Sequence, residues 1–323
     1  MTESVRVSVA IATRNGARFF DEQLQSILTQ TRPVDELVVS DDASSDATLD
    51  ILERRLSESA LDVTILRNDP PLGVVGNFTN ALAACTGDVI LLSDQDDVWH
   101  ADRVAASLAV LEDEHWLAMH SDARLIDTTG EPIGLKLLDA LEVSPMDRSR
   151  IARGDAFPLF LRRNLATGAT MAIRRELRDL ALPVPVGWIH DEWLAIVAAS
   201  LGRLTLVDRE LIDYRQHGAN EIGVAEPRVA TKVRRVLAPR GDRNRVLAER
   251  SASLEQRLSG LDVPAELRAD AASKRRFEAA RAALPRTRVR RIPGVLRMLS
   301  RGEYARFASR GRADVLRDLL QPW

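Results

Sequence analysis

The residues best suited to chemistry are three aspartates that follow a short, strongly apolar run. Residues 87–99 read Gly-Asp-Val-Ile-Leu-Leu-Ser-Asp-Gln-Asp-Asp-Val-Trp, so the run ends in Asp94, Asp96 and Asp97. In an extended chain Asp94 and Asp96 point to the same side, and two ionised carboxylates held close together repel unless a cation lies between them. Oxygen ligands favour Mg²⁺, Mn²⁺ or Ca²⁺ over Zn²⁺. The spacing fits such a site, and it fits a solvated acidic loop equally well.

The elements that position these aspartates form an alternating pattern. Residues 89–92 are apolar without interruption, which is typical of a strand buried on both faces of a parallel sheet. Strands are also expected over 5–13, 37–40 and 63–66, with amphipathic helices between them. The pattern predicts an α/β fold, a doubly wound and mainly parallel sheet with helices on both faces.

In such a sheet, side chains that follow neighbouring strands meet at one edge. Asp41 and Asp42 follow the strand at 37–40 much as Asp94 and Asp96 follow the strand at 89–92. An aspartate at this edge can accept hydrogen bonds from a base or a ribose hydroxyl. Asp42 could equally cap the loop that follows it.

Composition limits the class of protein. The 323 residues suffice for a large α/β domain with an appendage, or for two domains. A single cysteine, Cys85, excludes a disulfide framework and a cysteine-based zinc site. The first residues lack the pattern of a signal peptide, and no apolar stretch approaches the length of a membrane span. We therefore expect a cytoplasmic protein.

Charge is distributed unevenly along the chain. The net charge is −2, but residues 225–323 hold 24 Lys and Arg against 11 Asp and Glu, a net charge of +13. The sequence thus predicts a first domain over 1–224 and a basic helical region over 225–323. In that region Arg286, Arg288, Arg290 and Arg291 precede an apolar helical face. This pattern suits an anionic membrane surface, and it also fits a solvated helix. Nucleic acid is disfavoured because aromatic side chains are scarce.

Four motifs in order make the first domain resemble a family of known enzymes. They are Val-Ser-Val-Ala-Ile-Ala-Thr-Arg-Asn-Gly at 7–16, Gln-Ser-Ile-Leu-Thr-Gln-Thr at 25–31, Val-Val-Ser-Asp-Asp-Ala-Ser-Ser-Asp at 38–46 and Leu-Ser-Asp-Gln-Asp-Asp at 92–97. Together they resemble family 2 glycosyltransferases with the GT-A fold, over about residues 5–220. Ser-Asp-Gln-Asp-Asp-Val-Trp, His-Asp-Glu-Trp at 190–193 and Tyr-Arg-Gln-His-Gly at 214–218 resemble the bacterial rhamnosyltransferase-like subgroup.

The resemblance implies an inverting hexosyltransferase that uses a nucleotide-sugar donor, dTDP- or UDP-linked, and a divalent cation, Mn²⁺ or Mg²⁺. Asp94 and Asp96 match the metal-binding Asp-x-Asp of the family, and His217 matches a histidine that meets the metal or the diphosphate. The implied nucleotide-binding residues are Thr13, Arg14, Asn15, Asp42 and Asp94. Many relatives carry an aromatic residue at the position of Arg14, and a guanidinium can also stack on a base.

On the acceptor side, Asp191 takes the position of the catalytic base, and Gly168, Thr170, His190 and Trp193 are expected to line the donor sugar or the acceptor. The implied function is the transfer of a sugar, rhamnose in this subgroup, to a glycan or lipid-linked glycan in cell-surface polysaccharide synthesis. From the charge of residues 225–323, which lie beyond the resemblance, we also expect peripheral attachment to the inner face of the cell membrane.

Plainer interpretations of these residues stay open. Asp191 could cap a helix, His217 could be a loop histidine, and Trp193 could be a packing residue. At the level of the whole protein, the rivals are a non-catalytic nucleotide-sugar binding protein and a phosphoacceptor signalling domain. The second needs a lysine beyond a later strand, and residues 100–130 contain none.

Overall fold

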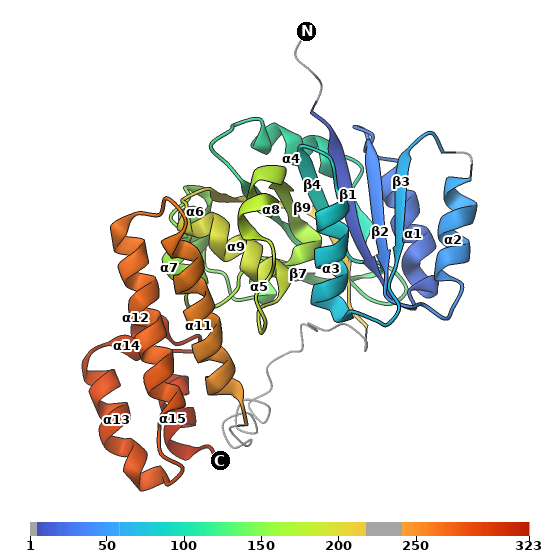
Figure 1. The fold of residues 1–323 in the computed structure, drawn as a ribbon. Helices are drawn as coiled ribbons and strands as arrows, with labels where there is room; N and C mark the ends of the chain where they lie inside the picture. Colours follow the sequence, from blue (N-terminus) through green and yellow to red (C-terminus); the bar gives the residue numbers. More distant parts are fainter. Residues whose placement is uncertain (1–4, 58, 218–240, 323) are drawn as a thin grey trace. The chain divides into compact units, whose positions relative to one another are not determined.

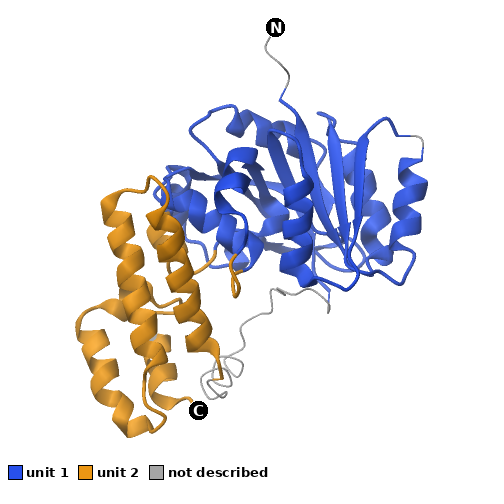
Figure 2. Ribbon diagram, in the orientation of Figure 1, with its two compact units in different colours: residues 1–156, 165–184, 189–224 blue, residues 157–164, 185–188, 225–323 orange. Residues whose placement is uncertain are grey.

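The protein is described by a computed structural model that covers residues 5–57, 59–217 and 241–322. It divides into two compact units, which Figure 2 distinguishes by colour. Unit 1 comprises residues 1–156, 165–184 and 189–224, and unit 2 comprises 157–164, 185–188 and 225–323. Gly218 of the 214–218 motif and residues 225–240 of the basic region lie outside the described residues.

Unit 1 is built on a nine-stranded sheet, whose first half is parallel. The strands β1 (Val7–Thr13), β2 (Glu36–Asp41), β3 (Asp62–Arg67) and β4 (Val89–Ser93) lie in the order β3-β2-β1-β4 (Figure 1). Residues of β1, β2 and β4 are almost all buried, because helices cover both faces of these apolar strands. In register, Thr13 pairs with Asp41 and Ile11 pairs with Ser93, so the carboxyl ends of the three strands are adjacent.

The second half of the sheet is mixed. It contains β5 (Val98–Trp99), β6 (Ala118–Ile126), β8 (Met171–Arg174) and β9 (Leu204–Arg215), and β7 (Pro132–Lys136) pairs with β6. β8 joins β4 to β6 in antiparallel fashion, whereas β6 and β9 are parallel. The predicted α/β class with a mainly parallel sheet and a helical C-terminal region is confirmed, with β8 as the point where the strand direction reverses.

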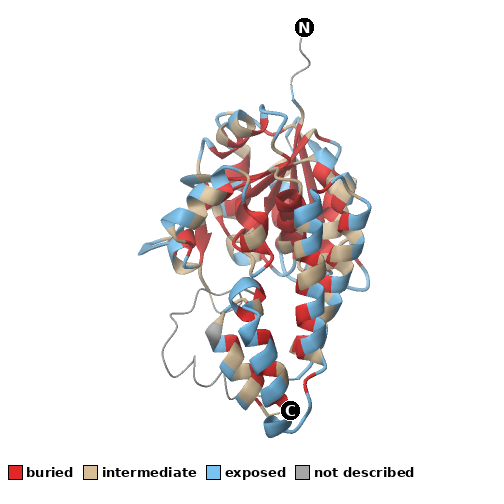
Figure 3. Ribbon diagram, turned by 90° about the vertical axis from the view of Figure 1, so that its left-hand side faces the viewer, coloured by how far each residue is buried: buried red, intermediate tan, exposed pale blue. Residues whose placement is uncertain are grey.

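The helices of unit 1 follow the apolar periodicity of the sequence. They are α1 (Ala17–Leu28), α2 (Thr48–Leu56), α3 (Gly73–Ala84), α4 (Arg103–Leu111), α8 (Arg175–Ala181) and α9 (His190–Ser200). In α1 the buried residues Phe20, Leu24 and Ile27 lie three or four positions apart, which places them on one face. Figure 3 shows this segregation of buried and exposed residues across the molecule.

The segment 130–150 has little apolar periodicity in its sequence, yet it contains regular structure. Besides β7 it contains α5 (Leu137–Ala140) and α6 (Pro145–Ala152), and a 3₁₀ turn follows later at Gly168–Thr170. The start of α6 has a local cause, because the Ser144 hydroxyl accepts the N–H of Asp147 and Pro145 occupies the first turn. The weak apolar periodicity of these short helices conceals them from pattern analysis.

Unit 2 is helical. Its elements are α7 (Phe157–Phe160), α11 (Arg243–Ser259), α12 (Ala265–Ala282), α13 (Arg288–Ser300), α14 (Glu303–Phe307) and α15 (Arg312–Leu320). Phe277, Tyr304 and Phe307 pack together at its centre, with the Phe277 and Tyr304 rings edge to face at 5.2 Å. In the described residues no helix is both long and apolar enough to cross a bilayer.

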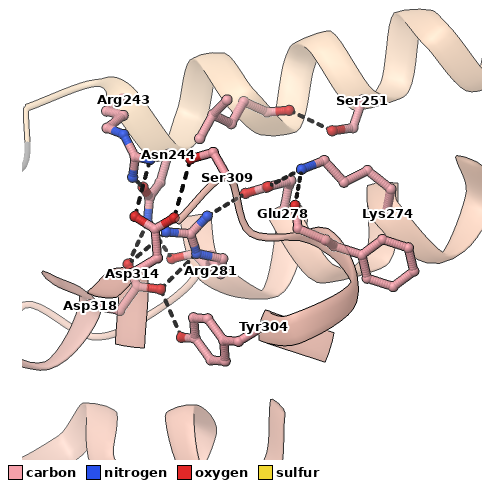
Figure 4. A network of polar contacts seen from close by, with 12 residues as sticks. Arg243, Asn244, Ser251, Lys274, Glu278, Arg281, Tyr304, Ser309, Asp314 and Asp318 are labelled. Atoms are coloured by element: carbon pink, nitrogen blue, oxygen red, sulfur yellow. Dashed lines mark hydrogen bonds and ion pairs between the residues drawn. The ribbon is translucent and has the colours of Figure 1, made fainter. Parts of the chain in front are cut away.

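A buried polar network ties the helices of unit 2 together (Figure 4). The Arg281 guanidinium donates to Asp318 Oδ2 at 2.6 Å and to Glu278 Oε2 at 3.0 Å, and both carboxylates are buried. Tyr304 donates to Asp318, and the Lys274 ammonium donates to Glu278. Because each buried charge has a partner of opposite sign, the network avoids the cost of unpaired charges in a small core.

Candidate active site

A cleft of about 270 Å³ opens in unit 1 at the carboxyl ends of β1, β2 and β4. Strands β1 and β4 supply its floor, and the start of α9 supplies one wall. Most of the residues predicted to do chemistry line it: Thr13, Arg14, Asp42, Asp94, Asp96, Gly168, His190 and Asp191. Residues more than 170 positions apart in sequence thus meet at one edge of the sheet, as the strand order requires.

The acidic loop after β4 carries Asp94, Asp96 and Asp97. Asp96 Oδ2 lies 2.6 Å from His217 Nε2, so two of the three predicted metal ligands are in direct contact. Asp97 is buried, and one of its oxygens accepts the N–H of Arg215 at 3.0 Å. Burial raises the pKa of Asp97 well above its usual range, and the nearby charges of Asp96 and Asp94 raise it further. The loop therefore concentrates negative charge that a cation would neutralise.

The donor set fits a divalent cation in part. Among residues 5–57, 59–217 and 241–322, no three His, Cys, Asp or Glu side chains are placed to hold a metal ion together. Asp96, which lines the cleft, and His217, which contacts it, would nevertheless supply one oxygen and one nitrogen ligand. Mg²⁺-type sites commonly use one or two protein carboxylates and take their other ligands from water and substrate phosphates, so the pair suits a cation that arrives with a diphosphate.

Arg215 is a site residue that sequence reasoning missed. Its side chain is buried, and it donates to the backbone carbonyl of Asp96 at 2.8 Å and to Glu22 Oε2 at 2.6 Å. The guanidinium also lies over the Phe19 ring, and that ring stacks on His217. Arg215 therefore fixes the acidic loop and the end of β9 to α1. The available signal was its place within the 214–218 motif, two residues before His217.

Asp191 lies in the first turn of α9, where the helix dipole favours a negative charge. It is 3% exposed, and its Oδ2 accepts the N–H of Gly168 at 2.9 Å. Its Oδ1 accepts the N–H of Glu192 at 2.6 Å. The capping residue of this helix is Ile189, so Asp191 is not the N-cap. Its carboxylate is held by two backbone donors while it lines the cleft.

Gly168 explains why this contact is so close. A Cβ at position 168 would lie 3.0 Å from His190 Nε2 and 3.3 Å from Asp191 Cβ, closer than most real contacts of a Cβ. Only glycine lets the backbone N–H approach the carboxylate of Asp191 without displacing α9.

His190 forms an apolar part of the wall. Its ring stacks on Phe78 with centroids 3.9 Å apart, and neither ring nitrogen has a hydrogen-bond partner within the described chain. Burial lowers the pKa of His190 to about 3. The imidazole is therefore neutral at physiological pH, and it places no positive charge beside Asp191.

On the opposite wall, Asp42 has a structural task as well as a place in the cleft. Its carboxylate accepts the N–H groups of Leu72 at 2.6 Å and Gly73 at 2.9 Å, at the start of α3. Arg14 is largely exposed, and its Nη1 lies 4.0 Å from Asp42 Oδ2. Thr13 is buried, and its hydroxyl donates to Asp41.

Four predicted residues do not line the cleft: His217, which contacts Asp96, and three residues with other contacts, Asn15, Thr170 and Trp193. Asn15 has a left-handed backbone (φ 49°), and its amide oxygen accepts the N–H of Ser45, so it shapes the turn after β2. Thr170 donates to the carbonyl of Thr167, and Trp193 is fully buried with its indole N–H donating to Ala181. None of the three lines the cleft. For Trp193, the packing interpretation describes the observed contacts.

Comparisons with known proteins bear on the fold and on the family. Residues 8–132 match the model of "Glycosyl transferase family 2". An uncharacterized glycosyltransferase of Nostoc sp. is 29% identical over 222 residues, which are 67% of this chain and 66% of the relative. The dTDP-rhamnosyl transferase RfbG of Shigella flexneri is 35% identical over 106 residues, 31% of this chain and 36% of the relative. The match thus spans about two thirds of the first relative's length and about a third of the second's.

Two solved structures share the fold over nearly the whole chain. Staphylococcus aureus TarS 1–349, in complex with UDP-GlcNAc, superposes with a TM-score of 0.62 at 15% identity, covering 98% of this chain and 90% of TarS. The mannosyltransferase PcManGT of Pyrobaculum calidifontis, in complex with GDP-Man and Mn²⁺, gives 0.55 at 20% identity, covering 99% and 86%. Residues 8–132 thus match glycosyl transferase family 2, the Nostoc glycosyltransferase is similar over 67% of the chain, and the chain has a GT-A fold.

Proposed function

We propose that the protein is a metal-dependent, inverting hexosyltransferase that moves a sugar from a nucleotide-diphosphate donor to a glycan or a lipid-linked glycan in cell-surface polysaccharide synthesis. One observation carries the proposal: a single cleft is lined both by the acidic loop of Asp94 and Asp96 and by the buried carboxylate of Asp191. Sugar transfer needs both features, one for the leaving diphosphate and one for the acceptor hydroxyl.

On the donor side, Thr13, Arg14, Asp42 and Asp94 would contact the nucleotide. Asp96 and His217 would hold Mn²⁺ or Mg²⁺ together with the diphosphate. When bound, the cation acts as a Lewis acid that offsets the charge developing on the leaving group. Mn²⁺ accompanies GDP-Man in PcManGT, and it is the first cation to test here. Asn15 would act on the nucleotide only indirectly, through the turn that it shapes.

On the acceptor side, Asp191 would accept the proton of the attacking hydroxyl. A base on the face of the sugar opposite the leaving group gives inversion at the anomeric carbon. Two backbone N–H donors and the start of α9 favour the ionised carboxylate. The ring of His190 is neutral and adds no positive charge of its own to the site of proton transfer.

The sugar and the base belong to the proposal too. We propose rhamnose from a dTDP donor, with UDP-linked hexoses as the second choice. Similarity to the dTDP-rhamnosyl transferase RfbG supports the first, although it covers 31% of this chain. TarS, whose structure contains UDP-GlcNAc, supports the second. The place of action would be the cytoplasmic face of the membrane, reached through the basic residues 225–323.

Donor-dependent thermal stabilisation tests this function. A ligand at about 100 times its Kd stabilises the folded state by about 2.7 kcal/mol, which raises the melting temperature of a protein of this size by about 5–10 °C. We expect that shift with one of dTDP-rhamnose, UDP-GlcNAc, UDP-glucose or GDP-mannose in Mn²⁺, and its loss on adding EDTA.

The control variants sharpen the test. Asp96→Asn should lose the Mn²⁺-dependent part of the shift, whereas Asp179→Asn, an exposed aspartate of α8, should keep it. If no nucleotide-sugar shifts the melting temperature with any metal, or if Asp96→Asn responds like wild type, the proposed donor site is wrong.

A further inference from the structure

One face of α13 is apolar and is left exposed by the described residues of unit 2. Val289, Ile292, Leu296 and Leu299 are 72%, 43%, 54% and 42% exposed. They recur at intervals of three and four residues, so they form one stripe along the helix. A protein that exposes such a stripe usually covers it with something.

The helix is held firmly by its opposite face. Val295 and Met298 are buried in the core of unit 2, and the guanidinium of Arg291 is buried with them. Arg291 donates to the backbone carbonyls of Pro285, Asp318 and Gln321. The exposed stripe is therefore a second apolar face of a helix that already packs into the core through Val295, Met298 and Arg291.

The surroundings of the stripe are strongly cationic. Between Glu278 and Glu303 the chain contains seven arginines and no acidic residue. Arg288, Arg290, Arg297 and Arg301 are exposed, and none of them forms an ion pair with another described residue. At 100° per residue, Arg290, Arg297 and Arg301 fall together about 80–120° around the helix axis from Val289, beyond one edge of the stripe.

We propose that α13 lies in the surface of a bilayer of anionic phospholipid, with the four apolar side chains at the acyl boundary and the flanking arginines on the lipid phosphates. An in-plane helix with an apolar face and a basic flank binds in this way. A second copy of the chain is a poorer occupant, because self-association would bring the same unpaired arginines together. A neutral protein surface is also a poorer occupant, because it offers no negative charge to the exposed arginines.

The inference names the lipid partner of the proposed transferase and does not depend on its sugar chemistry. Its test is sedimentation of the full chain with vesicles of phosphatidylglycerol and phosphatidylcholine, against phosphatidylcholine alone, at low and high salt. Wild type should bind only the anionic vesicles, and binding should weaken at high salt because exposed charges are screened.

Two pairs of variants locate the contact. Ile292→Gln/Leu299→Gln should lower the partition coefficient roughly tenfold or more. The matched control Ile133→Gln/Leu135→Gln changes side chains of nearly equal exposure, 43% and 44%, on β7, and should leave binding unchanged. Arg290→Gln/Arg297→Gln should lower binding about fivefold for each arginine, whereas Arg268→Gln/Arg276→Gln on α12 should lower it much less.

Several results would overturn the inference. The inference is wrong if wild type stays in solution with anionic vesicles at low salt, or if the β7 and α13 variants bind alike. It is also wrong if the α13 variant changes the molar mass in solution, which would assign the stripe to a second copy. Melting temperatures show whether each variant is folded. The donor-dependent thermal shift should be the same in the α13 variants, so failure of lipid binding and failure of the proposed function give different results.

Discussion

Gly168→Ala tests the contact that holds the proposed base. Position 168 has no positive φ, so the backbone tolerates alanine, and the loss of unfolded-state entropy would stabilise the protein by about 0.4–1 kcal/mol. Against this, the new Cβ would lie 3.0 Å from His190 Nε2 and 3.3 Å from Asp191 Cβ. Overpacking of this kind costs about 1–3 kcal/mol. The net loss should be about 1–2 kcal/mol, a fall of about 5 °C in melting temperature.

The effect on turnover should be larger than the effect on stability. His190 is stacked on Phe78, so relief comes by moving the start of α9, and Asp191 with it, by a few tenths of an ångström. A displacement of 1 Å can cost about 100-fold in rate, so we expect roughly a tenfold loss of kcat. The assay is chromatographic detection of the nucleoside diphosphate released from the donor, beside a melting curve.

Gly294→Ala is the matched control, because its Cβ would also meet a neighbour at 3.0 Å, but the neighbour is Leu284 Cδ2 in unit 2. It should alter melting temperature and leave kcat unchanged. If Gly168→Ala keeps wild-type kcat while its melting temperature falls, Asp191 is not held in place by this contact, and the reasoning about the base is refuted.

Three further predictions concern pH, the acidic loop and unit 2. Because burial lowers the pKa of His190 to about 3, the unfolded chain takes up a proton near pH 6.5 that the folded protein does not bind. The free energy of unfolding should therefore fall as the pH drops below about 6.5, by about 2 kcal/mol at pH 5 from this residue. Urea unfolding of His190→Leu should lose about 2 kcal/mol less than wild type between about pH 7 and pH 5, and an equal loss in both proteins would show that His190 is not the cause. Arg215→Lys should weaken Mn²⁺ binding in the presence of donor about 10–100-fold by calorimetry. If the variant binds Mn²⁺ as tightly as wild type, the hydrogen bond from Arg215 to the Asp96 carbonyl is not needed for metal binding. Arg281→Ala should cost about 3–5 kcal/mol in urea unfolding, since it leaves Asp318 buried without its cation and Glu278 paired with Lys274 alone; a loss below about 1 kcal/mol would mean that water replaces the guanidinium.

Much of the fold follows from local signals. The apolar runs of β1, β2 and β4 are buried on both faces, and each run ends where a polar side chain enters the cleft. The rule that parallel strands share an edge then brings Asp42 beside Asp94 without any knowledge of side-chain packing. The period of the apolar residues and the order of the strands and helices are therefore enough to predict this edge of the sheet.

Other features depend on contacts between distant residues. Arg215 binds the carbonyl of Asp96 and the carboxylate of Glu22, which are 119 and 193 positions away. Nothing near residue 215 signals those partners. For the same reason, the sequence could not show that Asn15 turns toward Ser45 or that Trp193 donates to Ala181. A motif predicts which residues gather, whereas tertiary packing decides which of them face the ligand.

The most direct measurement compares release of nucleoside diphosphate by wild type and by Asp191→Asn, with the donor found in the thermal screen, Mn²⁺ and an acceptor-bearing lipid extract. If Asp191 is the base, the variant should lose about 10²–10⁴-fold in kcat while its donor Kd stays the same. Asparagine keeps one of the two acceptor oxygens for Gly168 and Glu192, so a small fall in melting temperature is expected as well. Equal turnover by the two proteins, or binding of donor with no turnover by either, would contradict the account of this cleft as a sugar-transfer site.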